Sequence, residues 1–331
     1  MKKFIKDNIV QIIILILFAF VINYELPYYI EAPGGVINVT KRMNSDYDKK
    51  NGSLNMLYVT QYKGNVITVL LSKVIRSWDL NKIENQQISN EDADDIYLRN
   101  RVMLENSIQN ALFAAYSANG EEIKIKGRNN YVLAVTKDNG FFVGDKVLKI
   151  DNISVEDIDT IKDVLKNKKT GEKVSVLVNR NNHDITLNVE VPEDKILGIM
   201  VITNYIYDVP DDVSSIFKTS EGGSSGGMVL SLAIYSKISG IDILRGRNVA
   251  GTGTIDILGN VGEIDGIKYK IAGAVKNKMD LILVSPDNYD EALKVVEENK
   301  YNIEIVKVST LNDAINYLTK ESWFFNFFSF Y

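Results

Sequence analysis

The chain has 331 residues, of which 45% are hydrophobic and 24% charged, and its net charge is -5 at pH 7. This length allows about two compact domains, and the small negative charge gives no reason to expect nucleic-acid binding. The chain has no cysteine and one histidine, which excludes a thiol protease, a thiolate zinc site, disulfides and a His-Glu-x-x-His metalloprotease helix. The ATP-binding pattern Gly-x-x-x-x-Gly-Lys-Ser/Thr is also absent, and we expect no cofactor.

Residues 1–30 are predicted to form a cytoplasmic stub and a transmembrane anchor. An apolar run from Ile9 to Ile22, broken only by Gln11, follows three lysines. The run is short for a span of about 20 residues, and a cleaved signal peptide has a similar pattern. No small-x-small cleavage site follows Ile22, which favours an uncleaved anchor. The lysines before the run place the N-terminus inside the cell and the remainder outside the cell membrane.

Residues 31–122 are predicted to contain strands followed by a long helix. Two runs rich in strand-forming residues, 54–60 and 66–71, are joined through Lys63-Gly64-Asn65 and are typical of a hairpin. Apolar residues at helical intervals then predict a helix from about Ser89 to Ser117, ended by Asn119-Gly120.

Residues 123–195 have a different pattern. Residues 144–151 read Gly-Asp-Lys-Val-Leu-Lys-Ile-Asp, and a short helix and a closing strand pair follow, at 171–180 and 185–191. The order and spacing resemble a bacterial PDZ domain. A domain of this kind presents a strand edge that an extended peptide can join. A small strand-rich spacer is the alternative.

Residues 196–322 alternate between helical and strand patterns, which indicates a mixed α/β domain. Within it, residues 221–228 read Glu-Gly-Gly-Ser-Ser-Gly-Gly-Met ahead of an apolar helical stretch. The glycines let the backbone approach a substrate, and the helix start offers unpaired N–H groups for an oxyanion. A flexible loop has the same composition, and Ser224 can instead cap the helix.

A serine nucleophile needs a neighbouring base, and a lysine can serve when burial keeps it neutral. In the helix predicted from Ile267, Lys268 and Lys270 lie at the two edges of the apolar arc, whereas Lys276 points the opposite way. Periodicity therefore excludes Lys276 and leaves the other two lysines open.

Three segments resemble the proteolytic domain of Lon-type peptidases. Residues 223–227 are similar to the Gly-Pro-Ser-Ala-Gly nucleophile motif, residues 249–255 to the strand before the catalytic lysine, and residues 261–270 to Val-x-x-Ile-Gly-Gly-x-x-x-Lys. The resemblance implies that Ser225 is the nucleophile, Lys270 the general base and Thr252 a supporting hydroxyl. It also implies that three backbone groups lie near the oxyanion, those of Gly223, Ser224 and Gly226.

The order of segments resembles the YlbL and SepM group of Gram-positive surface peptidases. This implies an α+β fold in which residues 31–122 join the proteolytic domain at 196–322 and the PDZ domain is an insertion. It also implies an ATP-independent serine endopeptidase that cleaves secreted peptides or membrane-tethered proteins through an acyl-enzyme, and it allows a homo-oligomer. Ser224, Gly226 and Asp265 depart from the motifs, so an inactive PDZ peptide-binding scaffold is the alternative. The aromatic tail, 323–331, is expected to dock on the membrane or the domain.

Overall fold

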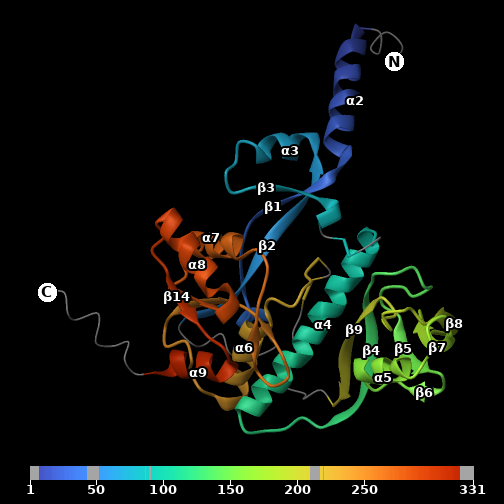
Figure 1. Ribbon diagram of the computed structural model, residues 1–331. Helices are drawn as coiled ribbons and strands as arrows, with labels where there is room; N and C mark the ends of the chain where they lie inside the picture. Colours follow the sequence, from blue (N-terminus) through green and yellow to red (C-terminus); the bar gives the residue numbers. More distant parts are fainter. Residues whose placement is uncertain are drawn as a thin grey trace.

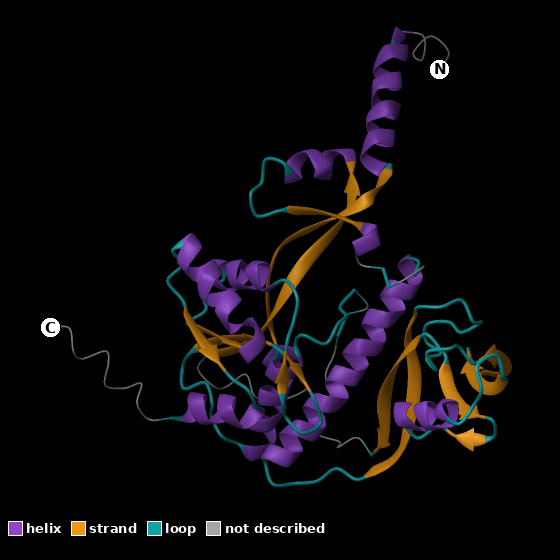
Figure 2. Cartoon of the chain, in the orientation of Figure 1, coloured by secondary structure: helices purple, strands orange, loops and turns teal. Residues whose placement is uncertain are grey.

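The computed structural model describes residues 7–42, 52–85, 87–88, 91–208, 217–218 and 220–320. These residues form a mixed sheet with helices on both faces and a second, strand-rich lobe that lies beside a long helix (Figures 1 and 2). The aromatic tail at 323–331 and residues 1–6 lie outside the described residues.

The mixed sheet has the strand order β14-β13-β10-β2-β1-β3. Its strands are β1 (Glu25–Asn38), β2 (Ser53–Asn65), β3 (Asp79–Lys82), β10 (Asn248–Thr252), β13 (Leu281–Val284) and β14 (Glu304–Lys307). Strand β1 runs antiparallel to β2 and β3, whereas β10 runs parallel to β2 and β13, and β13 parallel to β14. The β2–β10 pair, in which Asn248 lies opposite Ser53, therefore joins strands from the two ends of the chain.

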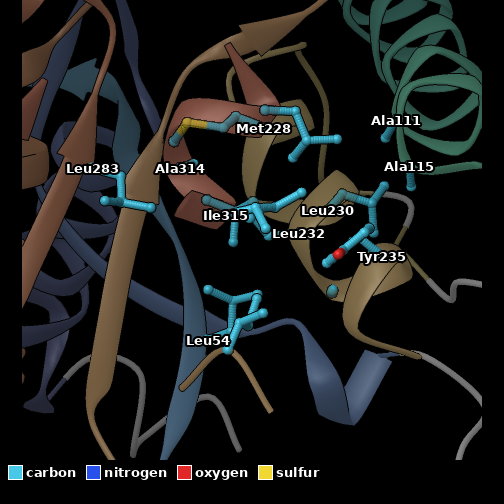
Figure 3. Packing of buried hydrophobic residues seen from close by; sticks show 14 of the residues in the cluster. Leu54, Ala111, Ala115, Met228, Leu230, Leu232, Tyr235, Leu283, Ala314 and Ile315 are labelled. Atoms are coloured by element: carbon cyan, nitrogen blue, oxygen red, sulfur yellow. The ribbon is translucent and has the colours of Figure 1, made fainter. Parts of the chain in front are cut away.

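Helices cover both faces of this sheet. On one face, α4 (Ala93–Ala118), α6 (Gly227–Ser239) and α9 (Leu311–Thr319) share a buried cluster with the strands (Figure 3). On the other face, α7 (Ile267–Lys276) and α8 (Pro286–Asn299) form a second cluster. All four residues of β13 are buried, as expected for a strand between two helix layers.

The helix ends follow ordinary capping chemistry. The Asp92 carboxylate accepts hydrogen bonds from the first-turn N–H groups of α4, and Ser285 caps α8 ahead of Pro286. Helix α6 ends at Gly240, which has a φ of 71° that glycine adopts without strain. Short 3-10 turns, η1 (Thr40–Arg42) and η3 (Ile83–Asn85), follow β1 and β3.

The strand-rich lobe has the order β8-β7-β5-β4-β9, with β6 paired to β5. Its elements are β4 (Ile125–Val135), β5 (Lys146–Ile150), β6 (Ile153–Ser154), α5 (Ile158–Lys166), β7 (Lys173–Arg180), β8 (His183–Glu190) and β9 (Ile199–Tyr207). The lobe has a hydrophobic cluster of its own. A small hairpin of β11 (Thr254–Ile255) and β12 (Val261–Gly262) lies between β10 and α7.

The hairpin predicted from runs 54–60 and 66–71 is wrong in its second half. Strand β2 continues to Asn65 and pairs with β1, and the second run forms helix α3 (Val66–Ser72). Its β-branched residues suggested a strand. The Asn65 side chain, however, accepts from the Thr68 N–H, and the Thr68 hydroxyl accepts from the Asn65 N–H. This reciprocal cap starts a helix.

The predicted transmembrane helix at the N-terminus is not supported. Helix α2 covers Ile9–Asn23, which is 15 residues. A bilayer core of about 30 Å needs about 20 helical residues. Within the part of the chain that the structure describes, no helix is both long enough and apolar enough to cross a membrane.

Candidate active site

Ser225 lies in the loop that leads into α6, and hydrogen bonds tie its backbone to the end of β10. The Ser225 carbonyl oxygen accepts from the Gly253 N–H at 2.9 Å and from the Thr252 hydroxyl at 3.2 Å. Thr252 is the last residue of β10 and is fully buried. The residue expected to support the site therefore holds the backbone of Ser225 against the centre of the mixed sheet.

Helix α4 holds the other side of the same loop. The Gly223 N–H donates to the Asn100 carbonyl at 2.9 Å, and the Ser107 hydroxyl donates to the Ser224 carbonyl at 3.1 Å. Neither α4 contact was predicted from the sequence. The contribution of Asn100 is a backbone group without a sequence signal, and the burial of Ser107 is seen only in the folded chain.

The backbone N–H groups of this loop differ in availability. The Gly223 N–H is engaged with Asn100, whereas those of Ser224, Ser225 and Gly226 have no acceptor among the described residues. A Cβ at Gly226 would overlap the end of the Met56 side chain on β2, so the loop approaches the sheet closely there and a larger residue would have to displace that side chain. Open N–H donors at a helix start can stabilise a developing negative charge.

The three lysines of α7 have different surroundings. Ile267, Ile271 and Ala274 face the sheet and are fully buried. Lys270 is only 3% exposed, whereas the Lys268 side chain is 51% exposed and forms an ion pair with Asp79. Lys276 is exposed, as the helical periodicity predicted. The two lysines that the sequence pattern left open therefore lie in opposite environments.

Burial lowers the pKa of Lys270 from 10.5 to about 8, and the negative charge of Asp265 acts in the opposite direction. No described residue forms a hydrogen bond or an ion pair with the Lys270 amine. Burial without a partner disfavours the ammonium form. With a pKa of about 8, roughly one molecule in ten has a neutral Lys270 at pH 7. A lysine of this kind can accept a proton.

The serine loop and the lysine helix contact nearby residues of β2 from opposite faces of the sheet. Gly226 contacts Met56, and Gly266, directly before α7, contacts Val59. Three strand residues span roughly 10 Å. Within the described ranges, Ser225 Oγ and Lys270 Nζ share no hydrogen bond, so their direct contact stays a prediction.

Asp79 of β3 organises the first turn of α7. Its carboxylate accepts hydrogen bonds from the Lys268 amine and the Tyr269 hydroxyl. Burial and then the bond to Asp79 raise the pKa of the Tyr269 phenol, which keeps it protonated. Because the partners are about 190 positions apart in sequence, the sequence pattern could not have revealed this contact.

In the strand-rich lobe, β9 is an edge strand, and β4 is its one partner among the strands that the structure describes. Part of its free edge faces α4, where the Asn106 amide donates to the Thr203 carbonyl and the Tyr205 N–H donates to Gln109, both at 2.8 Å. A cavity of about 570 Å³ lies between α4 and this lobe, and neither the Ser225 loop nor Lys270 lines it. The second lobe thus offers a partly open strand edge apart from the serine and the lysine.

Known proteins resemble two parts of this chain. Residues 215–321 match the Lon protease (S16) C-terminal proteolytic domain, and residues 122–191 match the PDZ domain. A solved PDZ domain of an SdrC-like protein from Listeria monocytogenes is 18% identical and covers 24% of this chain and 93% of that domain. Its TM-score of 0.21 is too low to add to the assignment.

Curated relatives of this chain are Lon proteases. The protein from Neorickettsia sennetsu is 31% identical over 103 residues, which cover 31% of this chain and 12% of the relative. That from Campylobacter jejuni is 29% identical over 184 residues, which cover 53% of this chain and 22% of the relative. The match therefore spans 12% to 22% of the length of these two relatives. The chain combines a Lon-type proteolytic domain with a PDZ domain, which confirms the resemblance seen in the sequence.

Proposed function

We propose that this chain is an ATP-independent serine endopeptidase with a Ser225–Lys270 dyad, attached to the cell membrane through α2 and acting outside the cell. The predicted anchor of residues 1–30 is shortened at its end, because Glu25 to Ile30 belong to strand β1. The observation that carries the proposal is the burial of Lys270 without a partner for its amine, which brings its pKa to about 8. The match of residues 215–321 to the Lon proteolytic domain supports the same chemistry.

In the proposed reaction, neutral Lys270 takes the proton of the Ser225 hydroxyl while Oγ attacks the peptide carbonyl carbon. The open N–H groups of Ser224 and Gly226 stabilise the oxyanion. The protonated lysine then gives its proton to the leaving amine as the C–N bond breaks. Water, deprotonated by Lys270, attacks the acyl carbon. The C–Oγ bond then breaks, and Lys270 returns its proton to Oγ, which releases the acid and free Ser225. The hydroxyl of Thr252 keeps the serine backbone in place.

The PDZ domain would hold the substrate as an extended strand on β9, with main-chain bonds giving affinity. Asn106 and Gln109 already bind main-chain groups of Thr203 and Tyr205. The edge from Ile199 to Ile202 is therefore the part offered to a peptide. Secreted peptides and membrane-tethered proteins are the proposed substrates.

Membrane attachment is supported by the character of α2. Every leucine, isoleucine and phenylalanine between Ile13 and Phe18 is at least 50% exposed, and water is an unfavourable environment for such a helix. The sequence before α2 adds Phe4 and Ile5, which extend the apolar segment.

A serine-directed acylating probe tests the proposed chemistry. The parent chain should be labelled on Ser225 and should cleave peptides, whereas Ser225→Ala should lose both. The matched control is Ser220→Ala, which changes an exposed serine five positions earlier and should leave both intact. Cleavage by Ser225→Ala at the parent rate would contradict the proposal, and peptide binding without labelling of the parent chain would favour the inactive scaffold.

A further inference from the structure

Exposed apolar side chains recur along the segment from α3 to the turn after β3, and α3 and β3 are in contact. Leu70, Leu71 and Val74 are 58%, 41% and 78% exposed, and Leu80 and Ile83 are 37% and 36% exposed. We refer to these five residues as the α3 face. No residue of α3 is buried, although six of its seven residues are apolar or carry a methyl group. A helix of this length is marginal in water without a packed face, so the α3 face needs a cover.

Cations lie between these apolar residues. Lys73, Arg76 and Lys82 are exposed, and none of them forms an ion pair with another described residue. Trp78 lies in the same segment and stacks on Tyr62 at 5.5 Å. A short helix with exposed apolar side chains, followed by free cations and a tryptophan, has the features of a segment that lies in the headgroup region of an anionic bilayer.

The register of the first hairpin places this face beside α2. Strand β1 begins at Glu25, directly after α2, and Glu25 pairs with Asn65, the residue that caps α3. The end of α2 and the start of α3 therefore leave the sheet at the same residue pair, and the two helices are in contact. Figure 1 shows α2 and α3 together at one end of the molecule, away from the PDZ lobe.

We propose that the α3 face docks on the outer leaflet of an anionic lipid bilayer next to α2. This rests on the membrane attachment included in the proposed function and adds a second, interfacial contact. Attachment through α2 alone would let the chain rotate relative to the bilayer, whereas contact at both helices would fix its orientation.

The docked orientation sets the height of the lysine helix above the bilayer. The start of α7 contacts Val59, which lies six residues before Asn65 on strand β2. Six strand residues span roughly 20 Å. The proposed dyad would then cleave peptide bonds at about that distance from the bilayer surface. Membrane-proximal segments of tethered proteins lie at such distances.

Site-specific fluorescence on the full chain tests this docking. Because the chain lacks cysteine, Leu71→Cys places a single environment-sensitive dye on α3. Leu293→Cys on α8 is the matched control, since both leucines are 41% exposed. Leu15→Cys reports on α2. Each variant is reconstituted into anionic vesicles with and without shallow nitroxide lipids, and its thermal midpoint is checked against the parent chain.

We expect nitroxide lipids to remove about half or more of the emission at position 71 and to leave that at position 293 nearly unchanged. Replacing Lys73, Arg76 and Lys82 by glutamine should weaken quenching at position 71 and abolish its dependence on salt.

Three results would overturn the docking. Quenching at position 15 without quenching at position 71 would leave only an anchor at α2. Quenching at neither position would remove both membrane contacts. A shielded but unquenched dye at position 71 would mean that protein, such as a second copy, covers α3. The probe reaction at Ser225 is measured on the same samples, so failure of the docking and failure of the proteolytic proposal are separate results.

Discussion

The PDZ domain and the proteolytic domain each bury a charged side chain, and they treat it differently. In the PDZ domain the Asp145 side chain is fully buried and accepts two hydrogen bonds from the Arg180 guanidinium, both at 2.7 Å. In the proteolytic domain Lys270 is almost as deeply buried, yet no described residue pairs with its amine. A buried charge is either paired or shifted toward its neutral form.

The difference separates a structural group from a reactive one. Asp145 also accepts from the Phe142 N–H at 2.9 Å, and Arg180 lies 4.1 Å from the Phe142 ring. These contacts hold a loop and satisfy the charge. Lys270 lacks such compensation, so burial destabilises its ammonium and leaves an amine that can accept a proton. The missing partner is what makes this lysine a candidate base.

The largest expected effect is the loss of peptide cleavage when the unpaired lysine, Lys270, is replaced. Lys270→Met should lower kcat/KM for peptide cleavage by about 10³-fold or more, because the serine loses its base. Lys268→Met, which removes an exposed lysine two positions earlier, should stay within about threefold of the parent. Peptide cleavage and labelling of Ser225 measure both variants. Equal losses in the two variants would contradict the assignment of Lys270.

Removing one partner of the paired charge should destabilise the PDZ domain. Asp145→Asn leaves Arg180 without its carboxylate, and loss of one partner of a buried pair typically costs about 3–5 kcal/mol. Arg180 retains 21% exposure, which places the expected loss at the lower end, about 3 kcal/mol. Denaturant unfolding followed by PDZ-domain signals gives the value. An unchanged unfolding midpoint would mean that the pair is not structural.

Removing the unpaired charge of Lys270 should stabilise the protein, in contrast to the loss expected for Asp145→Asn. Lys270→Met should raise the free energy of unfolding at pH 7 by up to about 3 kcal/mol, because the pKa shift from 10.5 to about 8 corresponds to about that much. Between these two pH values the unfolded parent binds more protons than the folded one, so parent stability rises with pH. The advantage of the variant should therefore be complete below pH 8 and decrease up to pH 10.5. A stability difference that does not vary with pH would exclude this linkage.

The smallest expected effect is a change in the pH profile. The rate of Ser225 acylation should rise with pH, with a midpoint at about 8, as Lys270 loses its proton. Asp265 raises the pKa of Lys270, so Asp265→Asn should move the midpoint to lower pH. Asp256→Asn, in the turn between β11 and β12, is the control for a general effect of lost negative charge. A midpoint that stays fixed in Asp265→Asn would show that this carboxylate does not act on the lysine.

Sequence reasoning found the segments of the fold where local pattern and tertiary structure agree. The α4 helix, predicted from about Ser89 to Ser117, covers Ala93–Ala118, and the family match confirms the PDZ domain. It failed at residues 66–71, where side-chain type suggested a strand and the Asn65–Thr68 cap formed a helix. It missed strand β1, because residues 1–30 were assigned to the anchor and Pro33-Gly34-Gly35 within the strand is a sequence typical of turns.

The site was predictable in its residue types but not in its supports. Helical periodicity narrowed the base to Lys268 and Lys270 because both lie at the edge of the apolar arc. The two lysines differ in burial because α7 packs on β1, and Asp79 of β3 pairs with Lys268. Both strands are distant from α7 in sequence. The contacts of Ser107 and Asn100 with the serine loop join residues more than 100 positions apart. Such contacts depend on the assembled fold and leave no local pattern.

The pairing of β2 with β10 determines when the chain can first become active. Ser53 and Asn248 are bound to each other across 195 positions, and the whole PDZ domain lies between them. During synthesis from the N-terminus the PDZ domain is complete before β10 and α7 exist. The mixed sheet, and with it the support for Ser225, can close only when nearly the entire polypeptide has been made. A half-made chain therefore lacks the β10 contacts that support Ser225, so the proposed activity has to wait for the C-terminal strands of the sheet.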